Sequence, residues 1–388
     1  MSNWLPPYER LDVAQREFIN GYTLGNTWLL GYAGSGKSIL LVYLLKRLKA
    51  ESDLHHLGKT FGVVVFTKAL GDLFRTGFNE LEITGVPIMT QFDLRRSPQF
   101  FDYLFCDEIQ DMSPETLAMI KGSAKNVICA GDSNQSIYAR DPLTNTPTIQ
   151  GNQPVTILGA SKTELNIIYR LTHSVIDAVR ALMPRMSENW AAMEDLTNVD
   201  VQIELRKAIS QERECTFVYD DARECCSRGE RTVVLFPHHN KILFFVNTIL
   251  HNQGKKKWDP VNDQWGKPNY YMMNAYLENQ GVPIMYIGNN YGSLSEAQQN
   301  DKIIIMTYSS SKGLDFENVY MPFVENGLFI TQNPVLDRAT FMVAITRSSH
   351  YLTLTYTGLP SEYVKTFRNQ CHFTDEAIIQ NRNGISIF

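Results

Sequence analysis

The sequence predicts an α/β protein with parallel β-sheets, divided into two domains. An apolar run at residues 28–30 breaks into a glycine-rich stretch that leads into a helical apolar pattern, the order expected of strand, loop and helix. Three further apolar runs end in polar residues, as buried parallel strands do, and they lie at 61–66, 101–106 and 126–130. At 388 residues the chain is long enough for two cores. We expect domains at residues 1–160 and 161–388.

The glycine-rich stretch runs Gly31-Tyr32-Ala33-Gly34-Ser35-Gly36-Lys37-Ser38 and has the composition of a phosphate-binding loop. Glycine permits left-handed backbone angles, so successive N–H groups can turn inward around a polyphosphate, and the helix N-terminus adds its dipole. Lys37 would reach the β- and γ-phosphates and Ser38 would ligate Mg²⁺, while Gly31, Gly34, Ser35 and Gly36 line the site. We expect Lys37 to face solvent in the nucleotide-free protein. A chance glycine-rich turn is disfavoured by the helix that follows, so the pattern predicts a nucleoside triphosphate site.

Acidic residues follow the strand predicted at 101–106. Carboxylates such as Asp107 and Glu108 are costly at the end of a buried strand unless they are solvated or bound to a cation. We interpret Asp107 as a ligand of Mg²⁺ and Glu108 as the base for the attacking water, the two acidic roles that phosphoryl transfer requires. The alternative is an acid-rich first helical turn. After the strand at 126–130, Gln135 is a candidate sensor of the γ-phosphate.

Two weaker signals lie nearby. Gln15, in an amphipathic helix predicted at 11–19, carries an amide suited to an adenine edge, although polar residues are common on such faces. Phe66, Thr67 and Lys68 end the strand at 61–66, at the edge where parallel sheets bind ligands. Phe66 is equally compatible with the core.

Composition limits the classes of protein. A formal net charge of -5 and a pI near 5.9 argue against a protein that coats nucleic acid through its whole surface. Neither an apolar run of membrane-spanning length nor an export signal is visible, so we expect a cytoplasmic protein without membrane contact. The six cysteines lack CxxC spacing, which predicts reduced, mostly buried thiols and no cysteine metal site.

Taken in order, these motifs resemble those of the UvrD/Rep branch of superfamily 1 helicases. The matching segments of the first half are Gln15 (Q motif), Gly31 to Ser38 (Walker A), Phe66-Thr67-Lys68 (first DNA-contacting motif), Asp107-Glu108-Ile109-Gln110-Asp111 (Walker B) and Gly131 to Tyr138 (third motif). Those of the second half are Tyr169-Arg170, Met306 to Phe316 and Val343-Ala344-Ile345-Thr346-Arg347. The resemblance therefore spans nearly the whole chain.

The resemblance implies roles for residues of the second half. Tyr169 would stack on adenine, while Arg170 and Arg347 would reach the γ-phosphate and stabilise the charge of the transition state. The other residues that it implicates are Gly313 and Asp315 at the nucleotide and Thr307 and Lys312 at the nucleic acid. We expect the second domain to supply all of these residues, Tyr169 included.

The expected fold is therefore two tandem RecA-like P-loop NTPase domains with an ATP cleft between them, crossed by single-stranded nucleic acid. The resemblance implies an ATP- and Mg²⁺-dependent helicase or translocase on single-stranded DNA that moves 3′ to 5′; composition and spacing do not separate DNA from RNA. An alternative is a nucleic-acid-stimulated ATPase switch that licenses a partner nuclease, for example in a bacterial or phage defence system. A small-molecule kinase is disfavoured, because it has no use for two finger arginines.

Departures from the family pattern are informative. The connections from 61–66 to 101–106 and from Gly288 to Ile303 are short, which leaves no room for the accessory domains that the family usually inserts there. The third motif lacks a tryptophan after Tyr138, and Ser309 stands where relatives carry histidine. The loop Lys255–Lys267 interleaves lysines with Trp258 and Trp265, which suits a single strand or a protein partner. A solvated loop with half-buried tryptophans is the equal alternative.

Overall fold

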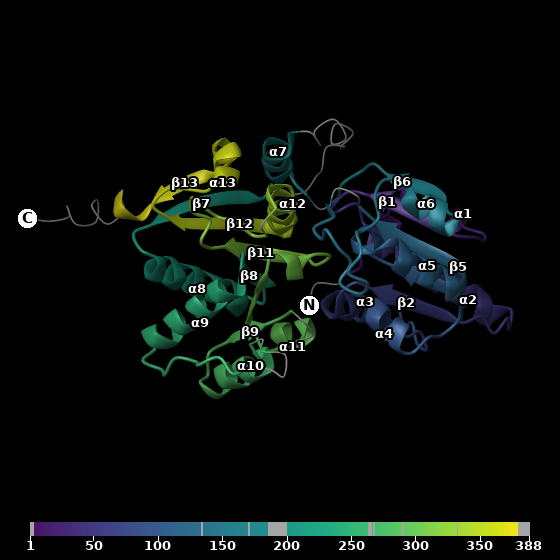
Figure 1. Cartoon of the computed structure of the whole chain (residues 1–388), viewed down its shortest axis with the longest axis horizontal. Coiled ribbons are helices and arrows are strands. Elements are labelled where there is room, and N and C mark those ends of the chain that lie inside the picture. The colour runs from purple at the N-terminus through teal and green to yellow at the C-terminus, as the bar shows by residue number, and fades with distance from the viewer. Residues whose placement is uncertain are drawn as a thin grey trace, which may run out of the picture. The chain divides into compact units, whose positions relative to one another are not determined.

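The structure, a computed structural model, describes residues 4–132, 135–169, 171–184, 200–262, 266, 268–288, 291–331 and 333–378. The chain folds as two compact units, which divide in the sequence between residues 170 and 171. Each unit is built on one parallel β-sheet with helices packed against it, as the alternation of apolar runs and helical patterns predicts (Figure 1).

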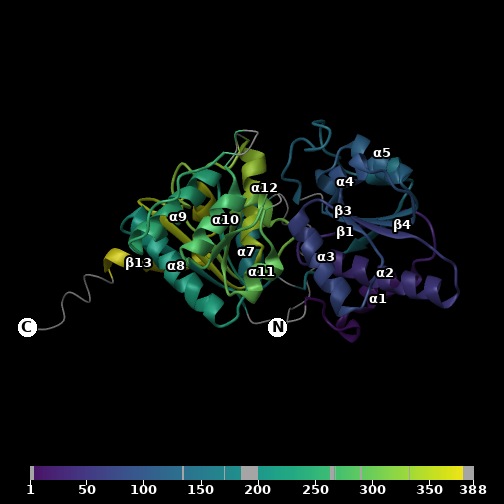
Figure 2. The same ribbon diagram turned by 90° about the horizontal axis from the view of Figure 1, so that it is seen from below.

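The first unit holds a six-stranded sheet in the order β3-β2-β4-β5-β1-β6, with all described neighbours parallel. Its strands are β1 (Thr27–Gly31), β2 (Phe61–Val65), β3 (Ile88–Thr90), β4 (Phe101–Cys106), β5 (Ala124–Gly131) and β6 (Ser161–Leu165). Its helices are η1 (Tyr8–Arg10), α1 (Val13–Gly21), α2 (Lys37–Leu54), α3 (Lys68–Glu80), α4 (Gln91–Arg96), η2 (Ile109–Asp111), α5 (Pro114–Gly122) and α6 (Gln153–Leu158). In Figure 2, α1, α2 and α3 lie on one side of this sheet and α4 and α5 on the other. Covering both faces explains why β2 is apolar and buried throughout.

The boundary expected at residue 160 is too early, because β6 belongs to the first sheet. β6 pairs with β1 along its whole length, from Thr27 opposite Ser161 to Gly31 opposite Leu165. Its sequence is polar and mostly exposed, as befits an edge strand. A search for apolar runs therefore misses it.

The second unit holds a seven-stranded sheet in the order β13-β7-β12-β11-β8-β10-β9, again parallel. Its strands are β7 (Gln202–Ala208), β8 (Thr232–Phe236), β9 (Ile284–Tyr286), β10 (Ile303–Thr307), β11 (Phe316–Met321), β12 (Ser348–Thr357) and β13 (His372–Asp375). Its helices are α7 (His173–Leu182), α8 (Gln211–Ser227), α9 (His239–Asn252), α10 (Tyr270–Asn279), α11 (Leu294–Gln299), η5 (Ser309–Ser311), α12 (Pro334–Ile345), α13 (Glu362–Thr366) and η6 (Arg368–Gln370). In β8, Val234 and Phe236 join one core cluster with α8 and α9, whereas Val233 and Leu235 are equally buried on the opposite face. This sheet is therefore also covered on both sides.

The two connections that the sequence marks as short contain small elements only. Between β2 and β4 lie α3, β3 and α4, and between β9 and β10 the described residues form α11. Neither connection holds an accessory domain in the part of the chain that the structure describes, which agrees with the expectation.

Trp258 does not project from a solvated loop. It is 4% exposed and packs in the core of the second unit, and its backbone exchanges two hydrogen bonds with the side chain of Asn247, at 2.8 and 3.1 Å. Stacking on a base and a half-buried position are therefore both wrong for this tryptophan. Trp265 and Lys267 lie outside the described residues.

Two further expectations concern the state of the cysteines and the presence of a membrane-spanning helix. All six cysteines are free thiols and five of them are buried, as predicted. Among the described residues, no helix combines the length and apolar composition needed to cross a bilayer.

Candidate nucleotide-binding site

The glycine-rich loop joins β1 to α2 in the first unit. Its backbone enters the left-handed region at Gly34 (φ 75°) and at Gly36 (φ 84°), the N-cap of α2. A Cβ at Gly31 would lie 2.5 Å from Ser35 Oγ. Glycine is therefore required at Gly34 and Gly36 by backbone angle and at Gly31 by lack of space. These are the conditions under which backbone N–H groups can face a phosphate.

Lys37 begins α2 and folds back over the loop. Its Nζ donates to the carbonyl oxygens of Gly31 at 2.8 Å and of Tyr32 at 2.9 Å, and the residue is only 8% exposed. The expectation that Lys37 faces solvent is therefore wrong. Carbonyl acceptors at the loop compensate the ammonium for its burial, because they satisfy its donors.

Ser38 and Asp107 meet at the carboxyl ends of β1 and β4. The Ser38 hydroxyl donates to Asp107 Oδ2, although 69 residues separate them in sequence. Asp107 is fully buried, and its pKa is raised, first by burial and then by the neighbouring Glu108 carboxylate. A hydroxyl and a carboxylate are the hard oxygen ligands that Mg²⁺ prefers. Among the described residues, no group of three or more His, Cys, Asp or Glu side chains could hold a metal.

Glu108 stands at a sharp turn between β4 and η2. Its backbone is left-handed (φ 58°, ψ 40°), which is uncommon for a residue other than glycine and costs on the order of 1–3 kcal/mol. Its N–H donates to Asp107 Oδ1 at 2.9 Å, and its Oε2 accepts from Gln110 Nε2 at 2.5 Å. Strain of this kind is concentrated at functional sites, which is consistent with a base held in place.

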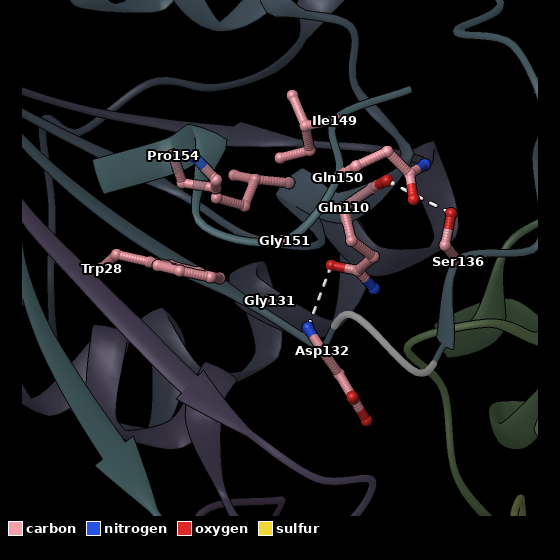
Figure 3. Close-up of a pocket in the computed structure, with 10 residues that line it drawn as sticks. Trp28, Gln110, Gly131, Asp132, Ser136, Ile149, Gln150, Gly151 and Pro154 are labelled. Carbon is pink, nitrogen blue, oxygen red and sulfur yellow. Dashed lines mark hydrogen bonds between the residues drawn. The ribbon is translucent and has the colours of Figure 1, made fainter. Parts of the chain in front are cut away.

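Gln135 lies just beyond β5 and is tied to the end of that strand. Its Nε2 donates to Asp132 Oδ2 at 2.7 Å, and both residues are about 3% exposed. The N–H of Ile137 donates to Asp111 Oδ1 at 3.2 Å, which anchors the same segment to η2. Figure 3 shows Gln110, Asp132 and Ser136 around a small cavity of about 30 Å³ behind this region.

Gln15 and Tyr169 lie near the two ends of the first unit in sequence, and both contact the glycine-rich loop. The Gln15 amide donates to Ser35 O at 3.2 Å and accepts from the N–H of Asp12 at 3.1 Å, so it holds the loop and caps α1. The N–H of Tyr169 donates to Gly34 O at 3.0 Å. Tyr169 thus belongs to the first unit, which corrects the expectation that the second domain supplies it. Arg170 lies outside the described residues.

The remaining candidates of the first unit follow β2. Phe66 is half-buried, with its ring centroid 5.3 Å from that of Tyr138, and the Thr67 side chain caps α3 by accepting from the N–H of Leu70 at 3.2 Å. Lys68 is exposed. Of these three residues, Lys68 is therefore the one whose side chain is open to a ligand, and it carries a positive charge.

The second unit buries most of its candidate residues. Thr307 is 9% exposed and Lys312 3%, so neither presents an open contact surface. Gly313 adopts φ 78°, and Asp315 Oδ2 lies 3.8 Å from Arg231 NH2.

Arg347 is 2% exposed and bonded inside its own unit. Its guanidinium donates to Val343 O at 2.7 Å, Leu314 O at 3.0 Å and Thr346 Oγ1 at 2.9 Å. These contacts join the motif around Leu314 to the one that ends at Arg347. The geometry therefore gives Arg347 a structural role within the second unit.

Sequence reasoning overlooked Gln110 and Asp132. Both stand inside motifs quoted above, and both are buried polar residues at strand ends, 4% and 3% exposed. The available signal was a glutamine two positions after Glu108, in a stretch otherwise assigned by its acids alone. Its partner at Asp132 becomes visible only in the fold.

Comparisons with known proteins agree with this arrangement. Residues 75–140 match the UvrD/REP helicase N-terminal domain, and residues 284–358 match the UvrD-like helicase C-terminal domain. A putative ATP-dependent DNA helicase, YjcD of Bacillus subtilis (strain 168), is 27% identical over 161 residues, which are 39% of this chain and 19% of that protein. The chain thus spans about a fifth of the length of this curated relative.

Solved helicase structures also align with the chain. The Arterivirus nonstructural protein 10 helicase in complex with DNA is 14% identical, with 92% of this chain and 65% of that chain covered at a TM-score of 0.42. The PRRSV helicase is 13% identical, with 96% and 68% covered at a TM-score of 0.43. One stretch in each unit therefore matches a UvrD-type helicase domain, and the motifs occur in the order found in the UvrD/Rep branch of superfamily 1 helicases, which this chain resembles.

Proposed function

We propose that the protein is an ATP-dependent translocase and helicase on single-stranded DNA. One observation carries the proposal: the Ser38 hydroxyl donates to Asp107 and thereby joins a phosphate loop to the acidic end of β4 in a single site. The matches to two UvrD-type helicase domains support the coupling of this site to DNA. The finer parts of the proposal are movement 3′ to 5′ and a cytoplasmic location, where ATP and single-stranded DNA are both available.

The residues of the first unit take distinct roles in this proposal. The loop from Gly31 to Ser38 binds the phosphates, Lys37 turns its ammonium from the loop carbonyls toward them, and Ser38 and Asp107 hold Mg²⁺. Bound Mg²⁺ would neutralise charge on the phosphate oxygens. Glu108 takes a proton from the attacking water. Gln135 contacts the γ-phosphate.

The second unit completes the mechanism that we propose. Closing over ATP, it brings Arg347 toward the γ-phosphate, and opening after hydrolysis advances one unit along the strand. This role requires the guanidinium to exchange some of its bonds within the second unit for phosphate oxygens. Arg347→Ala should lower turnover by about three orders of magnitude while ATP still binds. Folding is checked separately by calorimetry.

Two variants test the site itself. Lys37→Ala should abolish ATP hydrolysis, and Glu108→Gln should retain ATP binding but stop hydrolysis, because the water loses its base. Turnover and affinity for a fluorescent ATP analogue are measured together. Near-normal turnover of Lys37→Ala would remove the basis of the proposal, and weakened binding with intact hydrolysis in Glu108→Gln would mean that Asp107 and Glu108 have other roles.

Strand displacement separates the helicase from the switch. Single-stranded DNA should raise the ATPase rate, and added salt should reduce this stimulation, because binding to phosphates releases counterions. The purified chain should also displace a strand from a duplex with a 3′ overhang. DNA-stimulated hydrolysis without displacement would favour the switch that licenses a nuclease, with the exposed lysines Lys256 and Lys257 as the first place to seek a partner. No response to DNA or RNA at low salt would exclude both.

A further inference from the structure

Gln110 is a buried amide with two partners of fixed polarity. Its Nε2 donates to Glu108 Oε2 at 2.5 Å, and its Oε1 accepts from the N–H of Asp132 at 3.2 Å (Figure 3 shows the second contact). A carboxylate can only accept and a backbone N–H can only donate, so the amide has one orientation that satisfies both. Gln110 therefore bridges the second residue after β4 to the first residue after β5.

Asp132 extends this bridge to Gln135. The N–H of Asp132 donates to Gln110, and Asp132 Oδ2 accepts from Gln135 Nε2 at 2.7 Å. Ser136 Oγ donates to the backbone carbonyl of Gln110 at 3.4 Å, which ties the same turn to the segment after β5. Glu108, Gln110, Asp132 and Gln135 are each less than 9% exposed. Hydrogen bonds shielded from water in this way hold their groups firmly.

The strand end beside the amide is shaped for it. A Cβ added at Gly131 would lie 2.8 Å from Gln110 Oε1 and 3.1 Å from Ile109 Cγ1. An alanine there would push the amide out of its place, although the φ of Gly131 is not left-handed. Glycine at this position thus follows from the need to seat the Gln110 side chain.

We propose that Gln110 is a positioning residue, which holds the Glu108 carboxylate for proton transfer and fixes it relative to the Asp132–Gln135 pair. The inference rests on the proposed function, in which Glu108 is the base. Glu108 sits on a strained left-handed turn, and the hydrogen bond from Gln110 constrains the direction of its carboxylate. Without the amide, Glu108 keeps its backbone position but loses that constraint, and a displacement of about 1 Å can cost up to about 100-fold in rate.

Four variants test the proposal. Gln110→Leu removes the amide at similar volume, Gln110→Glu keeps the shape but loses the donor and places a second carboxylate beside Glu108, and Gly131→Ala displaces the amide. The control is Gln150→Leu, because Gln150 lines the same cavity but is exposed and bonds to Thr148 O at 3.4 Å.

Gln110→Leu should lower kcat for ATP by about 10- to 100-fold with little change in affinity for an ATP analogue. Gln110→Glu should not restore the rate, Gly131→Ala should reproduce the loss, and Gln150→Leu should behave as wild type. In nucleotide-free protein, the Asp132 amide should exchange its hydrogen faster in Gln110→Leu, because its acceptor is gone. This last readout does not depend on activity.

A double mutant separates positioning from a general structural effect. If Gln110 acts through Glu108, then Gln110→Leu should cause little further loss when Glu108 is already Asp, because this variant keeps a slow base whose shorter side chain does not reach the amide. Independent losses that multiply, an unchanged kcat in Gln110→Leu, or unchanged exchange at Asp132 would each overturn the inference while leaving the proposed function intact. Absence of ATP hydrolysis in the wild type would instead overturn the proposed function and the inference with it.

Discussion

Glu214 in α8 carries a buried carboxyl group whose charge should be visible in the stability of the second unit. The residue is 0% exposed, and its Oε1 accepts from the N–H of Phe323 and from Thr355 Oγ1, each at 2.7 Å. Its Oε2 is buried without a hydrogen-bond partner among the described residues, as is the hydroxyl of Tyr308. Burial, more than the nearby Glu325 carboxylate, raises the pKa of Glu214 to about 7.

The raised pKa of Glu214 determines how the stability of the second unit changes with pH. Between pH 4.5, the ordinary pKa, and about pH 7, the folded state keeps a proton that the unfolded state has released. The stabilisation is therefore complete below pH 4.5 and is lost as the pH rises through about 7. At about 1.4 kcal/mol for each pH unit, the loss amounts to roughly 3 kcal/mol.

Glu214→Gln removes this dependence, because the neutral amide keeps an acceptor for Phe323 and Thr355 and does not ionise. Relative to wild type, the variant should gain about 3 kcal/mol between pH 4.5 and pH 8. That is roughly 6–12 °C in the melting temperature of a unit of this size, measured by differential scanning calorimetry. Glu212→Gln, at an exposed position in the same helical turn, is the control and should change little. Parallel loss of stability in wild type and Glu214→Gln over this pH range would refute the reasoning.

Three further predictions test other parts of the fold by denaturant unfolding and nucleotide binding. Trp258→Ala should cost about 3–5 kcal/mol of stability, whereas the exposed Lys256→Ala should cost almost none; equal effects would contradict the burial of Trp258. Arg347→Ala should cost at least about 2 kcal/mol, because two backbone carbonyls and a hydroxyl lose a charged donor, and Arg347→Lys should recover only part of it. Unchanged stability in Arg347→Ala would mean that these bonds contribute nothing. Gly36→Ala should weaken binding of an ATP analogue, since the residue has φ 84° and its new Cβ would lie 3.0 Å from Gln15 Nε2; wild-type affinity would argue against a rigid loop.

The sequence by itself determined the strands and helices that carry the site in the first unit. The run that became β1, the loop and α2 is a local signal, because glycine at Gly34 and Gly36 and the apolar period of α2 act over a few residues. The apolar runs that became β2, β4 and β5 are equally local, since strands covered on both faces must be apolar throughout. Short connections likewise excluded accessory domains without any knowledge of the fold.

Only the tertiary structure decided which side chains meet. β6 pairs with β1 across more than a hundred residues although its sequence is polar, and Lys37 is turned onto carbonyls that its own loop presents. Trp258 lies among lysines in a loop that suggested stacking on a base or a half-buried position, yet it is buried in the core cluster of the second unit. Gln110 reaches Asp132 because β4 and β5 are neighbours in the sheet. Such contacts depend on the pairing of strands far apart in the chain, and no local pattern of residue types records that pairing.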